Sequence, residues 1–268
     1  MLFKNKNCEK CGNEYDQTYE ECPICKTKDR NFDSLNIPKQ IFWVSQMQQI
    51  ALFLMGLGWG GLAALQLLSG TVLSWLQDKG ETVYLFWANT VAYLLLAIIL
   101  FLITFNRKSE YPKHFKKWDS YLYGIAYAAT LVAISTVWSY LTTYVFKVGA
   151  NINQNAVVDV VKYNPPLALL VLGVIGATCE EFTYRVGLYS LLRRLNKYAA
   201  IIISSVIFGL IHLSFDSPDL ATEFIQLPNY IIAGAIFAIS YEHKGLPCAV
   251  TAHVAYDLFA MIGVLLRK

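Results

Sequence analysis

Residues 83–105 read VYLFWANTVAYLLLAIILFLITF, a run of 23 residues without one charged side chain. A helix of this length and composition can cross the roughly 30 Å hydrocarbon core of a bilayer. The whole chain agrees with that interpretation, because 56% of its 268 residues are hydrophobic and only 15% are charged. A soluble domain carries fewer apolar and more charged residues. We therefore expect a multi-pass membrane protein.

The other apolar segments extend this pattern along the chain. Together they predict about seven transmembrane helices, over roughly 43–68, 83–105, 121–145, 165–194, 198–213, 224–240 and 247–266. The fifth and sixth segments are short for a bilayer. The predicted fold class is an all-α polytopic membrane protein, with residues 41–268 as its transmembrane domain.

Basic residues are concentrated in alternate connecting segments. With a cytoplasmic N-terminus, sixteen of the 22 Lys and Arg residues fall on the cytoplasmic side and five on the other, while Arg185 lies inside the fourth apolar segment. Cytoplasmic loops of membrane proteins carry such an excess of positive charge. We expect a protein of the cell membrane with its N-terminus in the cytoplasm and its C-terminus on the opposite side.

Residues 1–40 have a different composition and predict a small soluble head. They hold seven basic and seven acidic side chains, and two C-x2-C pairs made by Cys8 with Cys11 and Cys22 with Cys25. Two such turns supply four thiolates to a tetrahedral site, so the pattern resembles a zinc ribbon with a structural zinc ion. Two disulfides are the alternative, but they need an oxidising compartment.

The expected zinc site has a structural role, since four thiolates leave the metal no open position for catalysis. The head has no excess of basic residues, and the net charge of the chain is only +3. We therefore expect no nucleic-acid binding. The head is predicted to bind a protein partner that the sequence does not identify, to sense a signal, or to guide a substrate.

Ionisable residues inside the apolar segments form a second group of candidates. A charged side chain in the middle of a bilayer is costly, so such residues are functional candidates by default. They come from three segments: Glu180, Glu181 and Arg185 from the fourth, His212 from the fifth, with Phe208 one turn before it, and His253 and Asp257 from the seventh.

Helical spacing separates the roles of the two glutamates. Glu181 and Arg185 are four residues apart and can form an ion pair on one helix face. Glu180 points about 100° away and stays free. A desolvated glutamate beside a histidine suits general-base activation of water. The residues alone leave three interpretations open: peptide-bond hydrolysis, a proton relay or proton-coupled carrier, and a buried polar network that only holds helices together.

The three motifs in this order resemble those of the CPBP family, the CAAX-processing and bacteriocin-processing intramembrane endopeptidases. That family carries E-E-x-x-x-R, F-x-x-x-H and H-x-x-x-N or a similar residue on separate transmembrane helices. The matching core covers about 165–266. The resemblance implies an intramembrane protease in which Glu180 and His212 activate water and the Glu181–Arg185 ion pair supports them. His253 and the residue four positions later would face the developing oxyanion.

One position departs from the family pattern, because Asp257 stands where Asn is commoner. An ionised carboxylate would repel an oxyanion, so we expect Asp257 to orient His253 or to be protonated. A catalytic zinc ion at Glu180, His212 and His253 is the alternative to the metal-free glutamate chemistry that we favour. The expected substrate is a membrane-associated or lipidated peptide or protein. The alternative function is a catalytically silent membrane sensor or scaffold of the same fold.

Overall fold

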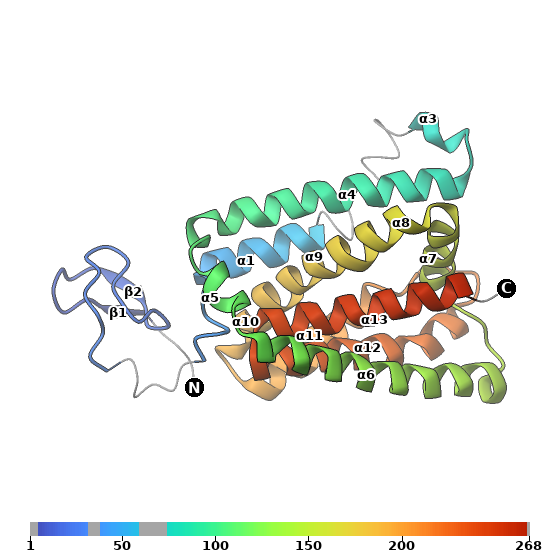
Figure 1. Cartoon of the computed structure of the whole chain (residues 1–268). Coiled ribbons are helices and arrows are strands. Elements are labelled where there is room, and N and C mark those ends of the chain that lie inside the picture. Colours follow the sequence, from blue (N-terminus) through green and yellow to red (C-terminus); the bar gives the residue numbers. More distant parts are fainter. Residues whose placement is uncertain (1–4, 32–37, 59–73, 267–268) are drawn as a thin grey trace.

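The computed structural model describes residues 5–31, 38–58 and 74–266, and shows a helical bundle with a small head at one end (Figure 1). The first elements in chain order are β1 (Asn5–Asn7), β2 (Glu14–Asp16), α1 (Gln46–Met55), α3 (Ser74–Gln77), α4 (Glu81–Thr104), the 3-10 turn η4 (Phe105–Arg107), α5 (Tyr111–Phe115) and α6 (Trp118–Tyr140). They are followed by the π-helical turn η5 (Leu141–Phe146), α7 (Ile152–Tyr163), α8 (Pro165–Ala168), the π-helical η6 (Leu169–Gly176), α9 (Ala177–Glu181), the π-helical η7 (Phe182–Tyr189), α10 (Ser190–Arg193), α11 (Lys197–Leu210), α12 (Leu220–Lys244) and α13 (Leu246–Leu266).

Five helical segments of the described chain are long and apolar enough to cross a membrane: Glu81–Arg107, Trp118–Phe146, Pro165–Arg193, Leu220–Lys244 and Leu246–Leu266. Large apolar side chains on their outer faces are exposed, for example Leu102, Ile125 and Val137. In water such faces would be costly, whereas in lipid they need no cover. The helical, multi-pass class expected from composition is therefore confirmed.

The predicted count of about seven spans is not confirmed. The segment expected at 198–213 is the helix Lys197–Leu210, which is shorter than the five spans. Its 14 residues extend about 21 Å at 1.5 Å per residue, less than a bilayer core. The segment expected at 43–68 begins with α1 at Gln46, and residues 59–68 lie outside the described part of the chain.

The helical segment 165–193 runs through the centre of the bundle and contacts α1, α4, α11 and α13. Its π-helical turns lie directly before and after α9, which carries the two adjacent glutamates. Such turns are rare and are often found at functional sites. Gly187 lets this segment approach α1, because a Cβ atom there would lie 2.8 Å from the backbone nitrogen of Phe53.

Two close pairs of helices lie beside the central segment: α13 packs along α6, and α11 packs along α12. Gly124 of α6 faces α13 so closely that a Cβ atom there would lie 2.8 Å from the carbonyl oxygen of Cys248. These pairs bring His253 on α13 and His212, just after α11, to the side of the central segment that carries Glu180.

The head consists of the antiparallel strands β1 and β2 and two cysteine turns, and it rests on one end of the bundle (Figure 1). The Asp16 carboxylate of the head lies 2.8 Å from the guanidinium of Arg194, and both side chains are at most 10% exposed. Arg194 also lies over the ring of Phe42, and Arg107 lies over the ring of Tyr19. We call this end of the bundle the head end, and the opposite end, where α7 lies, the far end.

Candidate active site

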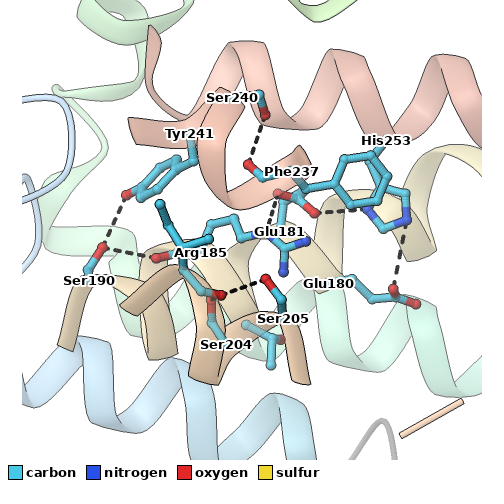
Figure 2. Close-up of polar contacts among 12 residues, drawn as sticks. Glu180, Glu181, Arg185, Ser190, Ser204, Ser205, Phe237, Ser240, Tyr241 and His253 are labelled. Carbon is cyan, nitrogen blue, oxygen red and sulfur yellow. Dashed lines mark hydrogen bonds and ion pairs between the residues drawn. The ribbon is translucent and has the colours of Figure 1, made fainter. Parts of the chain in front are cut away.

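Glu181 is the buried centre of the polar cluster (Figure 2). Its Oε2 lies 3.2 Å from Nε of Arg185, and both side chains are fully buried. Its Oε1 accepts a hydrogen bond of 2.9 Å from Nδ1 of His253. The Arg185 guanidinium also lies 4.8 Å from the ring centre of Phe208, a cation–π distance. The charge of Glu181 is thus neutralised within the protein.

The side chain of Glu180 points in a different direction from that of Glu181, although both residues lie on α9. Its Oε1 accepts a hydrogen bond of 3.1 Å from the hydroxyl of Tyr93 on α4. Its Oε2 lies 3.9 Å from Nε2 of His253, and the side chain is 19% exposed, unlike that of Glu181. The two adjacent carboxylates therefore differ in their surroundings: one is enclosed by an ion pair, and the other reaches an open space.

His253 is held on three sides. Its Nδ1 donates to Glu181, so its Nε2 faces Glu180 and the Asp257 carboxylate, whose Oδ2 is 3.5 Å away. The ring of Phe237 stacks on the imidazole at a centroid distance of 4.2 Å. The carboxylate of Glu181 thus accepts the hydrogen bond that holds the ring, a contact that the sequence did not predict, since we expected Asp257 to orient His253 or to be protonated.

His212 has its tautomer set by the backbone. Its Nδ1 lies 2.7 Å from the carbonyl oxygen of Phe208, which can only accept, so Nδ1 must be the donor. In a neutral imidazole, Nε2 is then free to accept a proton. The ring lies between the aromatic rings of Phe208 and Tyr230, and stacks on Tyr230 at 4.7 Å with an interplanar angle of 15°.

A buried network outside the three motifs holds the loop after His212. The Asn151 amide donates to the carbonyl oxygen of His212 and to the carboxylate of Glu223, both at 3.2 Å. Glu223 also accepts from the backbone N–H of Ser214 at 3.1 Å, and the Tyr230 hydroxyl donates to the Asn151 side chain. The ring and the backbone of His212 are therefore fixed by neighbouring contacts.

A cavity of about 240 Å³ brings four of the predicted site residues together. Its lining includes Glu180, His212, His253 and Asp257. Glu181 and Arg185 lie behind its wall, since both are fully buried and neither lines the cavity. A carboxylate, two imidazoles and a second acid thus share one small space, an arrangement that suits proton transfer to and from a bound molecule.

The cysteines of the head form a second cluster. Their four sulfur atoms all lie within 4.8 Å of one another. Cys8 and Cys25 are 3.4 Å apart, and Cys11 and Cys22 are 3.7 Å apart. Zinc–sulfur bonds of about 2.3 Å in a tetrahedron require sulfur separations of about 3.8 Å, so the cluster fits such an ion. In the part of the chain that the structure describes, no other group of His, Cys, Asp and Glu donors gathers as a candidate metal site.

The hydroxyl of Thr27 supports the deprotonated form of one of these cysteines. Its hydrogen bond to the sulfur of Cys25 holds the pKa of that thiol down at about 6, well below that of an ordinary thiol. The thiolate is the form that binds metal.

Three aromatic residues of the site did not emerge from the sequence. Tyr93 bonds Glu180, Phe237 stacks on His253, and Tyr230 stacks on His212. Each lies in an apolar helix, where aromatic residues are common for packing alone. The sequence offered no signal that would separate these three from the other aromatic residues of the chain.

Comparison with known protein families finds a match over the segment that holds the glutamates and histidines of the cavity. Residues 162–259 match the Rce1-like family of type II CAAX prenyl endopeptidases. The Rce1-like segment contains all three motifs, so the resemblance predicted from them is confirmed.

Two curated proteins extend the similarity. An uncharacterized protein of Mycoplasma capricolum subsp. capricolum is 30% identical over 226 residues, which cover 80% of this chain and 64% of that protein. A Bacillus subtilis protein named "Putative membrane peptidase YdiL" is 30% identical over 122 residues, which cover 44% of this chain and 46% of that protein. The matched regions thus span less than two thirds of either relative. No solved structure matches the chain significantly.

Proposed function

We propose that this protein is an intramembrane endopeptidase that hydrolyses a peptide bond of a membrane-associated or lipidated peptide or protein. The observation that carries the proposal is the difference between the surroundings of the two adjacent glutamates. Glu181 is neutralised by Arg185, whereas Glu180 lies in the cavity beside His253. Adjacent carboxylates with separate surroundings can take separate roles. The Rce1-like segment and the similarity to a protein named as a membrane peptidase support the same conclusion.

In this mechanism Glu180 is the general base. It takes a proton from a water molecule, whose oxygen attacks the carbonyl carbon of the peptide bond, and it then returns the proton to the departing amine. Tyr93 holds the carboxylate in position, and Nε2 of His212 assists in proton transfer. His253 lies beside Glu180 and, in its doubly protonated form, donates from Nε2 to the negative charge that develops on the carbonyl oxygen.

Asp257 contributes to that step in its protonated form. A neutral carboxylic acid can donate a hydrogen bond to an oxyanion, as the amide of an asparagine does. Its neighbours Glu180 and Glu181 are also acidic, which opposes a further negative charge in the same space. In the alternative function, a silent sensor or scaffold, Asp257 would remain ionised and block the reaction.

The proposed chemistry is metal-free, with zinc at Glu180, His212 and His253 as the alternative. One oxygen of Glu180 is already occupied by the Tyr93 hydroxyl. The donor atoms of these three residues do not gather as those of the four head cysteines do. Cleavage that persists after treatment with a zinc chelator supports the metal-free mechanism, and cleavage restored only by added zinc supports the alternative.

We further propose that residues 1–40 form a separate zinc-ribbon domain in the cytoplasm, in which Cys8, Cys11, Cys22 and Cys25 hold a structural zinc ion. Residues 41–268 form the transmembrane domain, with the catalytic core at about 165–266. The basic residues of the bundle support this orientation, because Arg107, Arg193 and Lys244 lie at its head end. A partner protein of the cell would bind the head.

The decisive experiment compares wild type with Glu180→Gln in reconstituted vesicles, using a diverse library of fluorogenic peptides that includes lipidated members. The variant is nearly isosteric and removes only the base. Cleavage that disappears in the variant supports the proposal. Equal behaviour of the two proteins, with no cleavage or the same trace cleavage, would favour the sensor or scaffold.

A further inference from the structure

The lining of the cavity runs from the middle of the bundle toward one end. Along α13 its lining begins at His253 and continues toward the C-terminus as far as Val264. Along α12 it uses residues from the middle of the helix, Asn229 to Phe237, and along α4 it uses Asn89 and Tyr93. These stretches lie at or near the middle of their helices, and the one along α13 continues toward the far end, where α7 lies (Figure 1). The cavity therefore extends from Glu180 toward the far end.

The head half of the bundle is filled by side chains. Tyr189, Tyr241 and Leu246 are at most 1% exposed there, and Ile41 of the segment that follows the head is fully buried. The hydroxyls of Tyr241 and Ser190 bond the carbonyl oxygen of Ile41 and close this region further. Within the described residues, the cavity that holds Glu180 therefore has no lining residue from this filled region.

Helix α7 supplies the wall at the far end. Asn153, Gln154, Val157 and Val160 of this helix line the cavity, and Gln154 is also exposed on the surface. The helix lies at the end of the bundle opposite the head (Figure 1). Its sequence INQNAVVDVVKY mixes polar and apolar residues, as expected at a membrane–water boundary. Gln154 is thus a point at the far end where the lining of the cavity reaches the surface.

The chemistry of the lining restricts what can bind. Among the described residues that line the cavity none is Lys or Arg, while Glu180 and Asp257 are acidic. The described lining thus offers no Lys or Arg to bind a free terminal carboxylate or a phosphate. The side-chain amides of Asn89, Asn153 and Asn229 can bond a peptide backbone. The other wall is apolar and suits apolar side chains.

We infer that the substrate is an uncharged or basic internal segment of a peptide, which reaches Glu180 from the membrane face opposite the head. This inference rests on the proposed peptidase function. It adds the side of access, and it excludes substrates that must place a free carboxylate beside the cleaved bond. With the head in the cytoplasm, the substrate is presented on the outer side of the membrane.

The side of access is tested with full-length protein in sealed vesicles. Vesicles with the head inside are separated from vesicles with the head outside by capture through an N-terminal tag. A membrane-impermeant fluorogenic peptide is added to each, before and after permeabilisation with detergent. We expect at least tenfold faster cleavage in sealed head-inside vesicles than in sealed head-outside vesicles, and equal rates after permeabilisation. Cleavage confined to sealed head-outside vesicles overturns the inference.

Absence of cleavage even after permeabilisation would count against the peptidase function and not against the side of access. A second measurement covers that case. An impermeant maleimide is applied to the variants Gln154→Cys and Lys116→Cys, and its attachment is located by mass spectrometry. In head-inside vesicles we expect labelling at position 154 and none at the head-end control position 116. Labelling at position 154 only in head-outside vesicles overturns the inference.

The chemistry of the substrate is tested with three matched peptides. One carries Glu next to the cleaved bond, one carries Lys there, and one carries Gln. We expect kcat/KM to fall at least tenfold for the Glu peptide relative to the Gln peptide, and to be equal or higher for the Lys peptide. Equal or faster cleavage of the Glu peptide contradicts the inference about charge.

Discussion

Nδ1 of His253 lies 2.9 Å from Oε1 of Glu181, so the second of two adjacent glutamates orients the histidine that faces the first. The same Glu181 pairs with Arg185 through its other oxygen. One buried carboxylate thus links the helix segment 165–193 to α13 and leaves Nε2 of the imidazole toward Glu180. The geometry of the cavity depends on a residue that does not line it.

The first prediction concerns this buried carboxylate. Glu181→Gln leaves the Arg185 charge without its partner in the interior, and losing one member of a buried ion pair costs about 3 to 5 kcal/mol. We expect a clearly lower thermal unfolding temperature in detergent. Glu180→Gln is the matched control and should unfold near the wild-type temperature, because its side chain is partly exposed. Equal unfolding temperatures of both variants would contradict the structural role of Glu181.

The second prediction concerns Tyr93. Its hydroxyl donates to Glu180, and a hydrogen bond to a charged group contributes about 1.5 to 3 kcal/mol. If that contact positions the base, Tyr93→Phe should lower kcat by a factor of about ten or more with KM nearly unchanged. The control is Tyr144→Phe on the exposed surface of η5. A change in KM alone would show that Tyr93 contacts the substrate instead.

The third prediction concerns the contact between the head and the bundle. Asp16→Ala leaves Arg194 almost buried without its carboxylate, so the head should bind less firmly. We expect a protease to release the head several times faster than from wild type, measured by gel analysis over time. Glu9→Ala, at an exposed position of the head, serves as the control. Identical release rates for Asp16→Ala and wild type would mean that other contacts hold the head.

The fourth prediction concerns the metal content of the head. Four thiolates within bonding distance of one ion should retain about one zinc per chain. Elemental analysis of purified protein should find this zinc, and replacing both Cys8 and Cys11 by Ser should remove it. Replacing Cys179 and Cys248, which lie buried in the bundle, should not change the zinc content. A wild-type chain that contains disulfides and no zinc would disprove the proposed ribbon.

The fifth prediction concerns pH and His114, which packs against the ring of Trp43 in the cleft between the head and the bundle. Burial lowers the pKa of His114 below its usual value of 6.5. The unfolded chain therefore binds a proton at a higher pH than the folded chain, and stability falls as pH drops below about 6.5. Unfolding temperatures measured between pH 8 and 5 should show this fall. His114→Phe should reduce it, and an unchanged profile would exclude His114 as its cause.

The sequence predicted most of the architecture, since membrane spans depend on apolar length, which a single chain displays directly. It also singled out Glu180, His212 and His253, because ionisable residues in apolar helices are rare. It did not separate Tyr93 or Phe237 from packing residues, since their roles depend on contacts between distant helices. The same limit explains why the contact between Glu181 and His253, which lie on different helices, was not predicted. Asp257, one turn after His253 on the same helix, was considered for the orienting role instead, or as a protonated acid.

The number of membrane spans was difficult to predict for a different reason. Hydropathy gives no sharp end to an apolar segment, so 198–213 was read as a span although its helix ends at Leu210. The turn after it places His212 in the cavity and outside the helix. The network of Asn151 and Glu223 was also missed, because it joins the starts of α7 and α12, which are 72 residues apart in the chain.

The π-helical turn Phe182–Tyr189 interrupts the regular winding of the central segment 165–193. The wider winding of this turn sets the angle about the helix axis between the side chains of Glu180 and Arg194. Arg194 follows the end of the segment and contacts Asp16 of the head. Deleting one residue without a change in winding would rotate one part of the segment relative to the other by about 100°, whereas a deletion that converts the wider turn into α-helix would largely keep the two parts in register. A one-residue difference between these two positions in a related chain therefore has two readings, a change from π to α winding or a changed orientation of the head relative to the cavity.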